Sequence, residues 1–314
     1  MSRPRILVAE PEAFSAQAVS ILEASADVDL RPVEDLRPAF AEYDAVWMRL
    51  ARRVGAEELG VNPRCKVLAM AVTGLDHVDL QACAERGVTV VSLKGEVEFL
   101  RRVRATSELA VGLAMALMRR IPWAFSSVKD GVFDRDLFPG HELFEKTAGV
   151  IGVGRLGSIV ADYYRAFGMK VLAFDPRPDL PVGVERVSKL EELFARSDVV
   201  SCHVVLDEST RNLVGRSCFD AARPGLVFVN TARGGAVDET ALLEALQQGK
   251  IAGAALDVLA SEPEVRADDP LIQYARANEN LLIVPHIGGK TFESMEKTEI
   301  FIARKLLAAL EVAP

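Results

Sequence analysis

The stretch that decides the fold is Val150-Ile-Gly-Val-Gly-Arg-Leu-Gly157. Its apolar start is typical of a strand, and the residues that follow, 158–167, have a helical pattern. At such a turn the first glycine permits a tight bend, the second lets a pyrophosphate approach the backbone, and the third lets helix and strand pack closely. Free amides at the helix start favour phosphate. We therefore assign to a dinucleotide site Gly152, Gly154, Arg155, Leu156 and Gly157.

Asp175 ends the next strand-like run, eighteen residues beyond Gly157. A carboxylate at this position can accept hydrogen bonds from the adenosine ribose hydroxyls and would repel a 2′-phosphate. The spacing favours NAD over NADP, although Arg177 could meet a 2′-phosphate if Asp175 turned away. The glycines alone also fit a plain tight turn, but strand, helix and spaced acid together favour dinucleotide binding.

Strand-like and helix-length segments alternate on both sides of this turn, which predicts an α/β fold with two Rossmann-like domains and doubly wound parallel sheets. A long helical segment at 106–128, with a possible interruption at Pro122, joins the two series, and a last helix is predicted at 291–310. That last helix could pack back on the first series through an apolar face. We expect a substrate domain of residues 1–99 and 290–314, interrupted by a dinucleotide-binding domain of residues 100–289. The strand-like runs are 6–9, 45–48, 67–71, 88–91, 149–153, 171–175, 199–204, 226–230, 252–257 and 281–285.

Composition excludes several classes of function. The chain has 314 residues, half of them apolar, and a net charge of 37 − 45 = −8. Such a chain can bury a large core, and its acidity argues against a nucleic-acid partner. The four cysteines show no metal-binding spacing, and no signal peptide or membrane span is visible. We expect a soluble cytoplasmic protein without a metal site.

Three polar residues follow apolar strand-like runs of the second series or stand near them: Arg233, Glu262 and His286. A guanidinium can hold a carboxylate bidentately, and an imidazole can pass a proton near neutral pH. A carboxylate beside the imidazole can favour its charged form and fix its tautomer. Each residue alone could be an ordinary surface or structural group. Together they predict a catalytic site that interconverts a 2-hydroxy acid and a 2-keto acid.

Several motifs resemble those of the D-isomer-specific 2-hydroxyacid dehydrogenases, in particular phosphoglycerate dehydrogenases and glyoxylate or hydroxypyruvate reductases. The resemblance covers nearly the whole chain. The motifs are Val72-Thr-Gly-Leu-Asp-His-Val-Asp79, Ser107-Glu-Leu-Ala110, Gly140-His-Glu-Leu143, Lys146-Thr147, the glycine turn, Asn230-Thr-Ala-Arg-Gly-Gly235, Leu256-Asp-Val-Leu-Ala-Ser-Glu-Pro263 and Pro285-His-Ile-Gly-Gly289.

The resemblance implies NAD-dependent hydride transfer, with Arg233 binding substrate, His286 as acid/base and Glu262 as its partner. It places the substrate carboxylate at the backbone of Thr73 and Gly74. It also implies a homodimer joined through the cofactor domain and catalysis in a cleft between the domains. Further cofactor contacts would come from His203, Val204, Thr231, Ala232, Asp257 and Gly288.

One segment departs from the family pattern. Residues 92–104 are longer and more charged than the family's usual stretch, and Arg49 stands where phosphoglycerate dehydrogenases place an anion-binding arginine. The basic residues of the segment from Lys94 to Arg104 could serve a phosphate- or phosphonate-bearing substrate, or could pair with Glu96 and Glu98 on a solvated helix. Two other functions stay open: a dehydrogenase of another small anion, such as formate or phosphite, and a non-enzymatic NAD-sensing scaffold like a corepressor.

Overall fold

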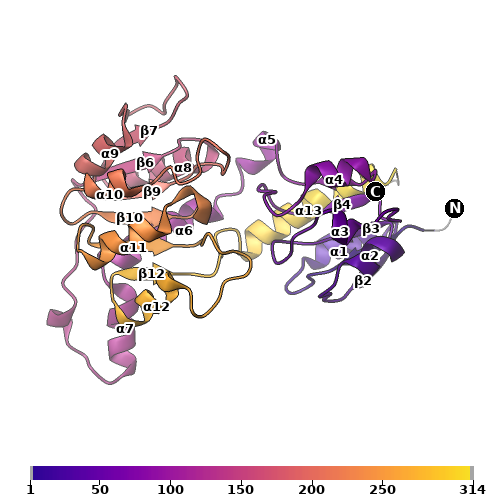
Figure 1. Cartoon of the computed structure of the whole chain (residues 1–314), viewed down its shortest axis with the longest axis horizontal. Coiled ribbons are helices and arrows are strands. Elements are labelled where there is room, and N and C mark those ends of the chain that lie inside the picture. Colours follow the sequence, from indigo (N-terminus) through magenta and orange to yellow (C-terminus); the bar gives the residue numbers. More distant parts are fainter. Residues whose placement is uncertain (1–2, 312–314) are drawn as a thin grey trace. The chain divides into compact units, whose positions relative to one another are not determined.

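The computed structural model describes residues 3–311. The chain forms two compact units: one runs to Val103 and resumes at Lys290, and the other spans Arg104–Gly289. Each unit is an α/β structure built on one parallel sheet (Figure 1), so the predicted fold class is confirmed. Within residues 3–311, no helix has both the length and the apolar character needed to cross a membrane.

The second unit contains a seven-stranded sheet in the order β12-β11-β10-β9-β6-β7-β8, with parallel neighbours. From β6 the chain winds in one direction through β7 and β8 and in the other through β9 to β12. The winding therefore reverses between β6 and β9, and open α/β sheets bind ligands at the carboxyl ends of strands beside such a point. The strands are β6 (Thr147–Ile151), β7 (Lys170–Phe174), β8 (Val184–Arg186), β9 (Val199–Cys202), β10 (Val227–Asn230), β11 (Gly253–Leu256) and β12 (Leu281–Ile283).

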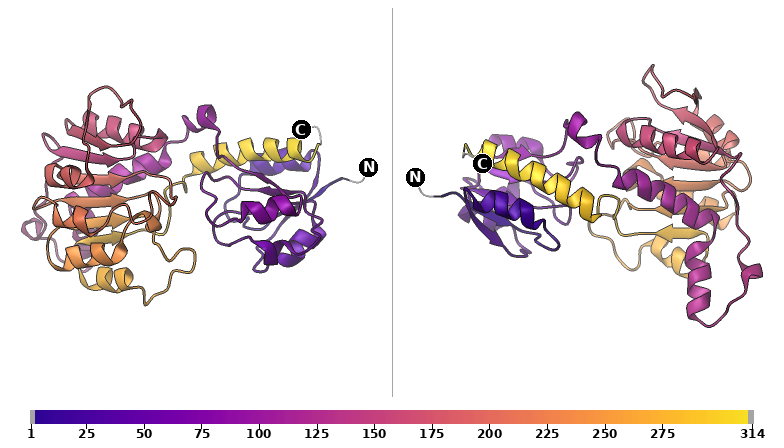
Figure 2. Two further views of the ribbon diagram at one scale, coloured as in Figure 1. Left: turned by 45° about the horizontal axis from the view of Figure 1, so that its top comes forward. Right: turned by 180° about the vertical axis from the view of Figure 1, so that it is seen from behind.

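Helices cover both faces of this sheet, as the views in Figure 2 show. On one face α6 (Ala105–Met118) and α8 (Arg155–Ala166) pack around Val160 and Tyr164. The opposite face is packed around Phe194, Phe219 and Phe228. Because both faces are buried, the central strands are almost entirely apolar. The helices of the opposite face are α9 (Leu190–Arg196), α10 (Arg216–Asp220), α11 (Glu239–Gln247) and α12 (Pro270–Ala277).

The first unit has a five-stranded parallel sheet in the order β2-β1-β3-β4-β5. Its terminal helix α13 (Phe292–Ala309) packs beside α1 (Ala16–Glu23) on one face. Ile302, Ala303, Leu306 and Leu307 are fully buried there, which confirms the predicted apolar face of the last helix. The other elements are β1 (Arg5–Val8), β2 (Asp27–Leu30), α2 (Arg37–Glu42), β3 (Ala45–Trp47), α3 (Ala56–Leu59), β4 (Val67–Ala69), α4 (Leu80–Glu85), β5 (Thr89–Val91) and α5 (Val97–Leu100).

The helix expected at 106–128 is divided. α6 ends at Met118 and α7 (Ile121–Lys129) begins after Arg120, which has a left-handed backbone with φ 53°. Pro122 lies in the first turn of α7, where its missing N–H is not needed. The chain then forms the short helix η1 (Arg135–Leu137) before it enters β6.

Candidate active site

The three predicted catalytic residues lie in loops that follow three neighbouring strands. Arg233 comes after β10, Glu262 after β11 and His286 after β12. These strands are adjacent and parallel, so their carboxyl ends share one edge of the sheet. The three residues therefore follow the carboxyl ends of these strands, the edge at which open α/β sheets bind ligands.

Glu262 and His286 are in direct contact. Nδ1 of His286 lies 2.5 Å from Oε2 of Glu262, and each side chain is about a quarter exposed, at 26% and 28%. The other carboxylate oxygen of Glu262 accepts a hydrogen bond from the backbone N–H of Leu259 at 2.7 Å. His286 has a left-handed backbone with φ 50°, a conformation that surrounding contacts must hold in place for a non-glycine residue.

Asp257 supplies those surrounding contacts. Its carboxylate is buried and accepts hydrogen bonds from the backbone N–H groups of Ile287, at 2.6 Å, and Gly288, at 2.9 Å. Its backbone carbonyl accepts from the N–H of His286 at 2.8 Å. Burial raises the pKa of Asp257, and the two N–H donors oppose that rise. Asp257 therefore holds in place the loop that carries His286. This role is additional to the cofactor contact that the family resemblance implies for Asp257.

Arg233 stands on a turn organised by Asn230. The Asn230 side chain accepts from the N–H of Ala232 at 3.0 Å and donates to the carbonyl of Arg233 at 3.0 Å. Gly234 follows, and a Cβ added there would meet the backbone of Leu259 at 2.0 Å. The Arg233 turn therefore packs directly against the segment that leads to Glu262. The structure brings Glu262 and His286 into contact and puts Arg233 on the adjoining loop.

The glycine turn has the geometry that a dinucleotide requires. Gly152 has a φ of +82°, and a Cβ on Gly157 would lie 1.9 Å from the Gly152 carbonyl oxygen. At Gly154 an added Cβ would meet nothing within 4 Å, so the backbone is open to a ligand. Arg155 and Leu156 begin α8 directly after it. The backbone of the turn therefore requires glycine at positions 152 and 157, and the open backbone at Gly154 fits a pyrophosphate.

Asp175 follows β7, as expected for the acid that recognises the ribose. Its carboxylate is nearly buried and accepts from the N–H of Val153 at 2.7 Å. Arg177 also binds it through its backbone N–H and two guanidinium nitrogens. Burial acts to raise the pKa of Asp175, but the hydrogen bonds from Arg177 and Val153 outweigh it and leave this pKa below its ordinary value.

The loops after β9 and β10 lie at the same carboxyl edge of the sheet, and each carries a buried polar atom without a hydrogen-bond partner within residues 3–311. His203 Nδ1 and Thr231 Oγ1 are buried and have no hydrogen-bond partner among the described residues. Burial lowers the pKa of His203 to about 4, so its ring is neutral. The backbone of His203 and Val204 packs on Gly152, and Ala232 is buried beside Thr231. Buried polar atoms normally have hydrogen-bond partners. The two unpartnered atoms therefore fit a site in which a bound dinucleotide would supply the missing hydrogen bonds.

Arg49, Thr73 and Gly74 belong to the first unit and follow β3 and β4. Arg49 donates to Oε1 of Glu299 at 2.7 Å and to the carbonyl of Glu12 at 2.8 Å. Glu299 is almost fully buried, at 2% side-chain exposure. The Arg49 carbonyl also contacts Nε2 of His77, at 3.1 Å, on the loop that carries Thr73 and Gly74. Both terminal nitrogens of Arg49 therefore already bind protein oxygens.

The basic segment from Lys94 to Arg104 lies on the surface, with its four cationic side chains exposed. Arg101 pairs with Glu98 at 3.3 Å, as the solvated-helix interpretation expects. Glu96 instead binds Lys305 of α13 at 2.6 Å. The ring of Phe99 stacks on Phe301, with centroids 4.0 Å apart. The segment is thus tied to α13 through Glu96 and Phe99.

Residues 111–288, more than half of the chain, match the model for the NAD-binding domain of D-isomer-specific 2-hydroxyacid dehydrogenases. A hydroxypyruvate reductase of Thermotoga maritima is 35% identical over 315 residues, which cover 99% of this chain and 100% of that protein. The chain belongs to the D-isomer-specific 2-hydroxyacid dehydrogenase family. Its second unit is the NAD-binding domain of that family.

Two further relatives show the range of this similarity. A D-3-phosphoglycerate dehydrogenase of Mycobacterium bovis is 36% identical over 319 residues, covering 99% of this chain and 57% of that protein. The chain thus spans little more than half the length of such curated relatives. A D-lactate dehydrogenase of Aquifex aeolicus, solved with NAD and lactic acid, has a TM-score of 0.84 at 27% identity and covers 98% of this chain and 95% of that one.

Sequence reasoning missed two residues that shape the site. Asn230 organises the Arg233 turn, and its position at a strand end before a polar turn was a usable signal. Glu239 accepts a hydrogen bond from the N–H of Ala260 at 2.7 Å and so holds the segment before Glu262. Burial raises the pKa of Glu239. Its sequence context predicts only an acidic helix start, so nothing local marked this role.

Proposed function

We propose that this protein is an NAD-dependent dehydrogenase that interconverts a D-2-hydroxy acid and a 2-keto acid. The contact between Glu262 and His286 carries the proposal, because it pairs a proton-transfer group with an orienting carboxylate at the cofactor-binding edge. Arg233, on the adjoining loop, supplies a guanidinium that can bind a carboxylate bidentately. Family membership supports the same reaction class.

Each residue has a defined part in this reaction. The bound dinucleotide supplies the hydride that adds to C2 of the keto acid. Because Nδ1 of His286 is occupied by Glu262, Nε2 is the nitrogen that delivers the proton to the resulting alkoxide oxygen. Arg233 holds the substrate carboxylate and polarises the keto oxygen. In the oxidation direction His286 takes the same proton back, and Glu262 stabilises the imidazolium that forms.

The cofactor and substrate contacts extend this assignment. We assign the pyrophosphate to the glycine turn with Arg155 and Leu156, the ribose to Asp175, and the carboxylate of the substrate to the backbone of Thr73 and Gly74 in the first unit, the substrate domain. We assign Asp257 to the nicotinamide end of the cofactor site. The remaining contacts on that side come from His203, Val204, Thr231, Ala232 and Gly288.

Within this substrate class we favour a 2-keto acid without a phosphate or phosphonate group. Arg49, the arginine that the family resemblance suggests for such a group, already donates to Glu299 and Glu12. The exposed cations of the segment from Lys94 to Arg104 are the remaining support for an additional anionic group. Relative turnover of hydroxypyruvate and phosphohydroxypyruvate measures this preference directly.

An NADH-oxidation assay tests the proposed reaction. We expect the protein to reduce at least one of glyoxylate, hydroxypyruvate, phosphohydroxypyruvate and phosphonopyruvate. NAD reduction with formate and with phosphite serves as the comparison for other small anions. If NADH binds tightly but no 2-keto acid turns over, the dehydrogenase proposal is wrong and an NAD-sensing scaffold becomes the better interpretation.

We also propose that the protein is a homodimer joined through the NAD-binding unit. α7 has no buried residue, and Phe125 and Phe133 are 66% and 92% exposed. Exposed aromatic side chains of this size favour an interface. Sedimentation equilibrium of the wild type and of Phe133→Asp tests this: the wild type should be a dimer, and the charged substitution should weaken it. A monomeric wild type would contradict the proposal.

We propose a cytoplasmic location, which the state of the four cysteines supports. Cys65, Cys83, Cys202 and Cys218 are buried and free. Burial raises the pKa of Cys65 and of Cys202 to about 12, so neither is a reactive thiolate. Such thiols are usual in a reducing compartment.

A further inference from the structure

The carboxylate of Asp175 has no acceptor position left for a ribose. Its Oδ1 accepts from Arg177 N at 2.8 Å and Nε at 3.0 Å, and its Oδ2 accepts from Val153 N at 2.7 Å and from a terminal Arg177 nitrogen at 3.1 Å. An ionised carboxylate offers about four lone-pair sites. All four are therefore taken, and two of them are taken by the Arg177 side chain.

A ribose diol needs the positions that the guanidinium occupies. Both hydroxyls of the NAD ribose would donate to Asp175, so the Arg177 side chain has to leave before the diol can bind. Leaving is not costly in itself, because the Arg177 side chain is 54% exposed whereas that of Asp175 is 5% exposed. An exposed guanidinium loses little when it returns to water.

For NADP, the electrostatic interaction with Asp175 and Arg177 is different. Its 2′-phosphate carries nearly two negative charges and would be repelled by a bare Asp175 carboxylate. With Arg177 in place, that carboxylate is neutralised and a guanidinium stands beside it. A guanidinium is well suited to bind phosphate. The same side chain thus hinders the ribose diol of NAD and lessens the repulsion of NADP.

From these contacts we propose that Arg177 is a specificity-determining residue for the cofactor, which competes with the NAD ribose for Asp175 and offsets the repulsion of the NADP phosphate. The wild-type protein accordingly binds both dinucleotides. The selectivity between them depends on the Asp175–Arg177 contact and can be shifted by changing Arg177 alone.

The backbone of the loop after β7, which carries Asp175 and Arg177, is held independently of the Arg177 side chain. Arg186, on β8, donates to the carbonyls of Asp175 and Arg177, each at 2.5 Å, and to that of Pro178 at 3.0 Å. Removing the Arg177 guanidinium therefore leaves the backbone of the loop clamped. Removing the Arg186 side chain should instead loosen the loop and weaken both dinucleotides alike.

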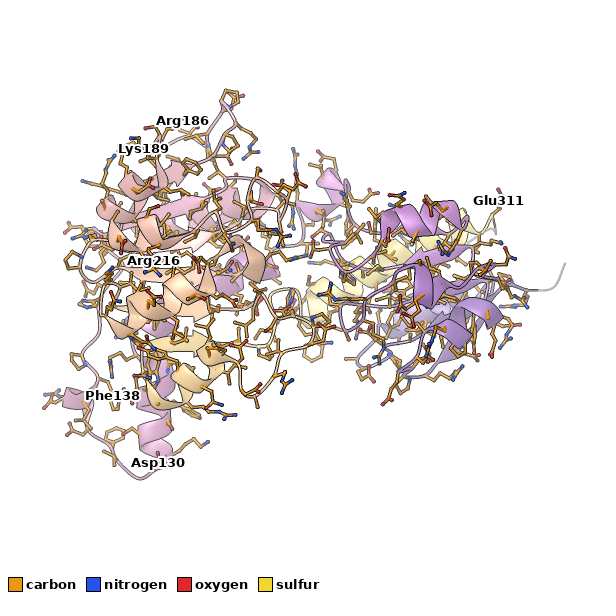
Figure 3. All side chains as sticks on the ribbon, viewed as in Figure 1. Asp130, Phe138, Arg186, Lys189, Arg216 and Glu311 are labelled. Atoms are coloured by element: carbon orange, nitrogen blue, oxygen red, sulfur yellow. The ribbon has the colours of Figure 1, made fainter. Side chains whose placement is uncertain are left out.

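Fluorescence titration of NADH and NADPH measures the two affinities without any substrate. Arg177→Met should tighten NADH and weaken NADPH, each by about twofold to fivefold, since an exposed ion pair of this kind is worth up to about this factor. Arg216→Met is the matched control. Arg216 is 53% exposed and pairs with Glu244 on the α10–α11 face. Figure 3 labels both Arg186 and Arg216.

Arg177→Lys supplies a second variant, because an ammonium keeps the charge but cannot occupy both carboxylate oxygens in the same way. It should tighten NADH less than Arg177→Met does and retain most NADPH binding. Unchanged NADH affinity in Arg177→Met would disprove the competition, and unchanged NADPH affinity would disprove the charge offset. Equal weakening of both dinucleotides, the result expected for Arg186→Met, would make Arg177 only a support of the loop.

Discussion

His286 and Glu262 are 24 residues apart in sequence, yet Nδ1 of the imidazole lies 2.5 Å from Oε2 of the carboxylate. The contact forms because β11 and β12 are neighbours in one parallel sheet and release their loops at the same edge. Leu259 holds the other oxygen of Glu262, and Asp257 holds the backbone after His286. The imidazole is therefore oriented by two carboxylates, one through its ring and one through its backbone.

The carboxylate charge of Glu262 can be removed with little change of shape. Glu262→Gln should lower kcat roughly 10- to 100-fold, because the amide no longer stabilises the imidazolium. NADH affinity should stay near that of the wild type. Glu264→Gln, an exposed neighbour in the same loop, is the control. A kcat unchanged in Glu262→Gln would rule out the orienting role.

Arg233 and His286 should be needed for turnover but not for cofactor binding. We expect Arg233→Ala and His286→Ala each to reduce kcat/KM by at least about 10²-fold, the lower range for loss of an acid–base group or a bidentate anchor. The dissociation constant of NADH should change little. Arg223→Ala, which removes a surface pair with Asp198, serves as the control. Full activity in either site variant would contradict the assigned roles.

His203 should make the second unit less stable as the pH falls. Its pKa is about 4 in the folded protein against 6.5 for the free side chain, so only the unfolded chain binds the proton between these values. The stabilisation is complete above pH 6.5 and is lost as the pH falls towards 4. From pH 7 to pH 5 the loss should be about 1–2 kcal/mol.

Denaturant unfolding followed through Trp123 in a Trp47→Phe background measures this dependence. His203→Gln should remove it, because an amide does not titrate in this range and the Gln amide reaches about as far as Nε2, the atom through which His203 contacts the hydroxyl of Ser201 at 3.0 Å. The same pH dependence in both proteins would assign it to another group.

Glu299 should be important for the stability of the first unit. Its carboxylate accepts from Arg49 and from the backbone N–H of Ser15 at 2.7 Å. Glu299→Ala leaves a mostly buried guanidinium without its carboxylate and should cost roughly 3 kcal/mol of unfolding free energy. Glu296→Ala, on an exposed part of the same helix, should stay within about 0.5 kcal/mol of the wild type. Calorimetry distinguishes the two variants, and equal melting temperatures would contradict the prediction.

Local sequence patterns predicted those elements whose burial is regular. The central strands are continuous apolar runs because both faces of each sheet are covered. The edge strands β2 and β8 escaped prediction, since Asp27–Leu30 and Val184–Arg186 are exposed or half-buried and have no apolar pattern. The division of the helix at Arg120 depended on one left-handed residue, whereas the proline marked only its neighbourhood.

The fold class, the glycine turn, and the positions of Asp175, Arg233 and His286 near strand ends could be predicted from the amino-acid sequence, because each depends on residues close together along the chain. Which side chains form contacts became clear only from the folded structure. Arg49 binds Glu299 across 250 residues, and Asp175 is already occupied by Arg177. Such pairings depend on how strands are ordered and how side chains are oriented in space, and neither leaves a periodic trace in the sequence.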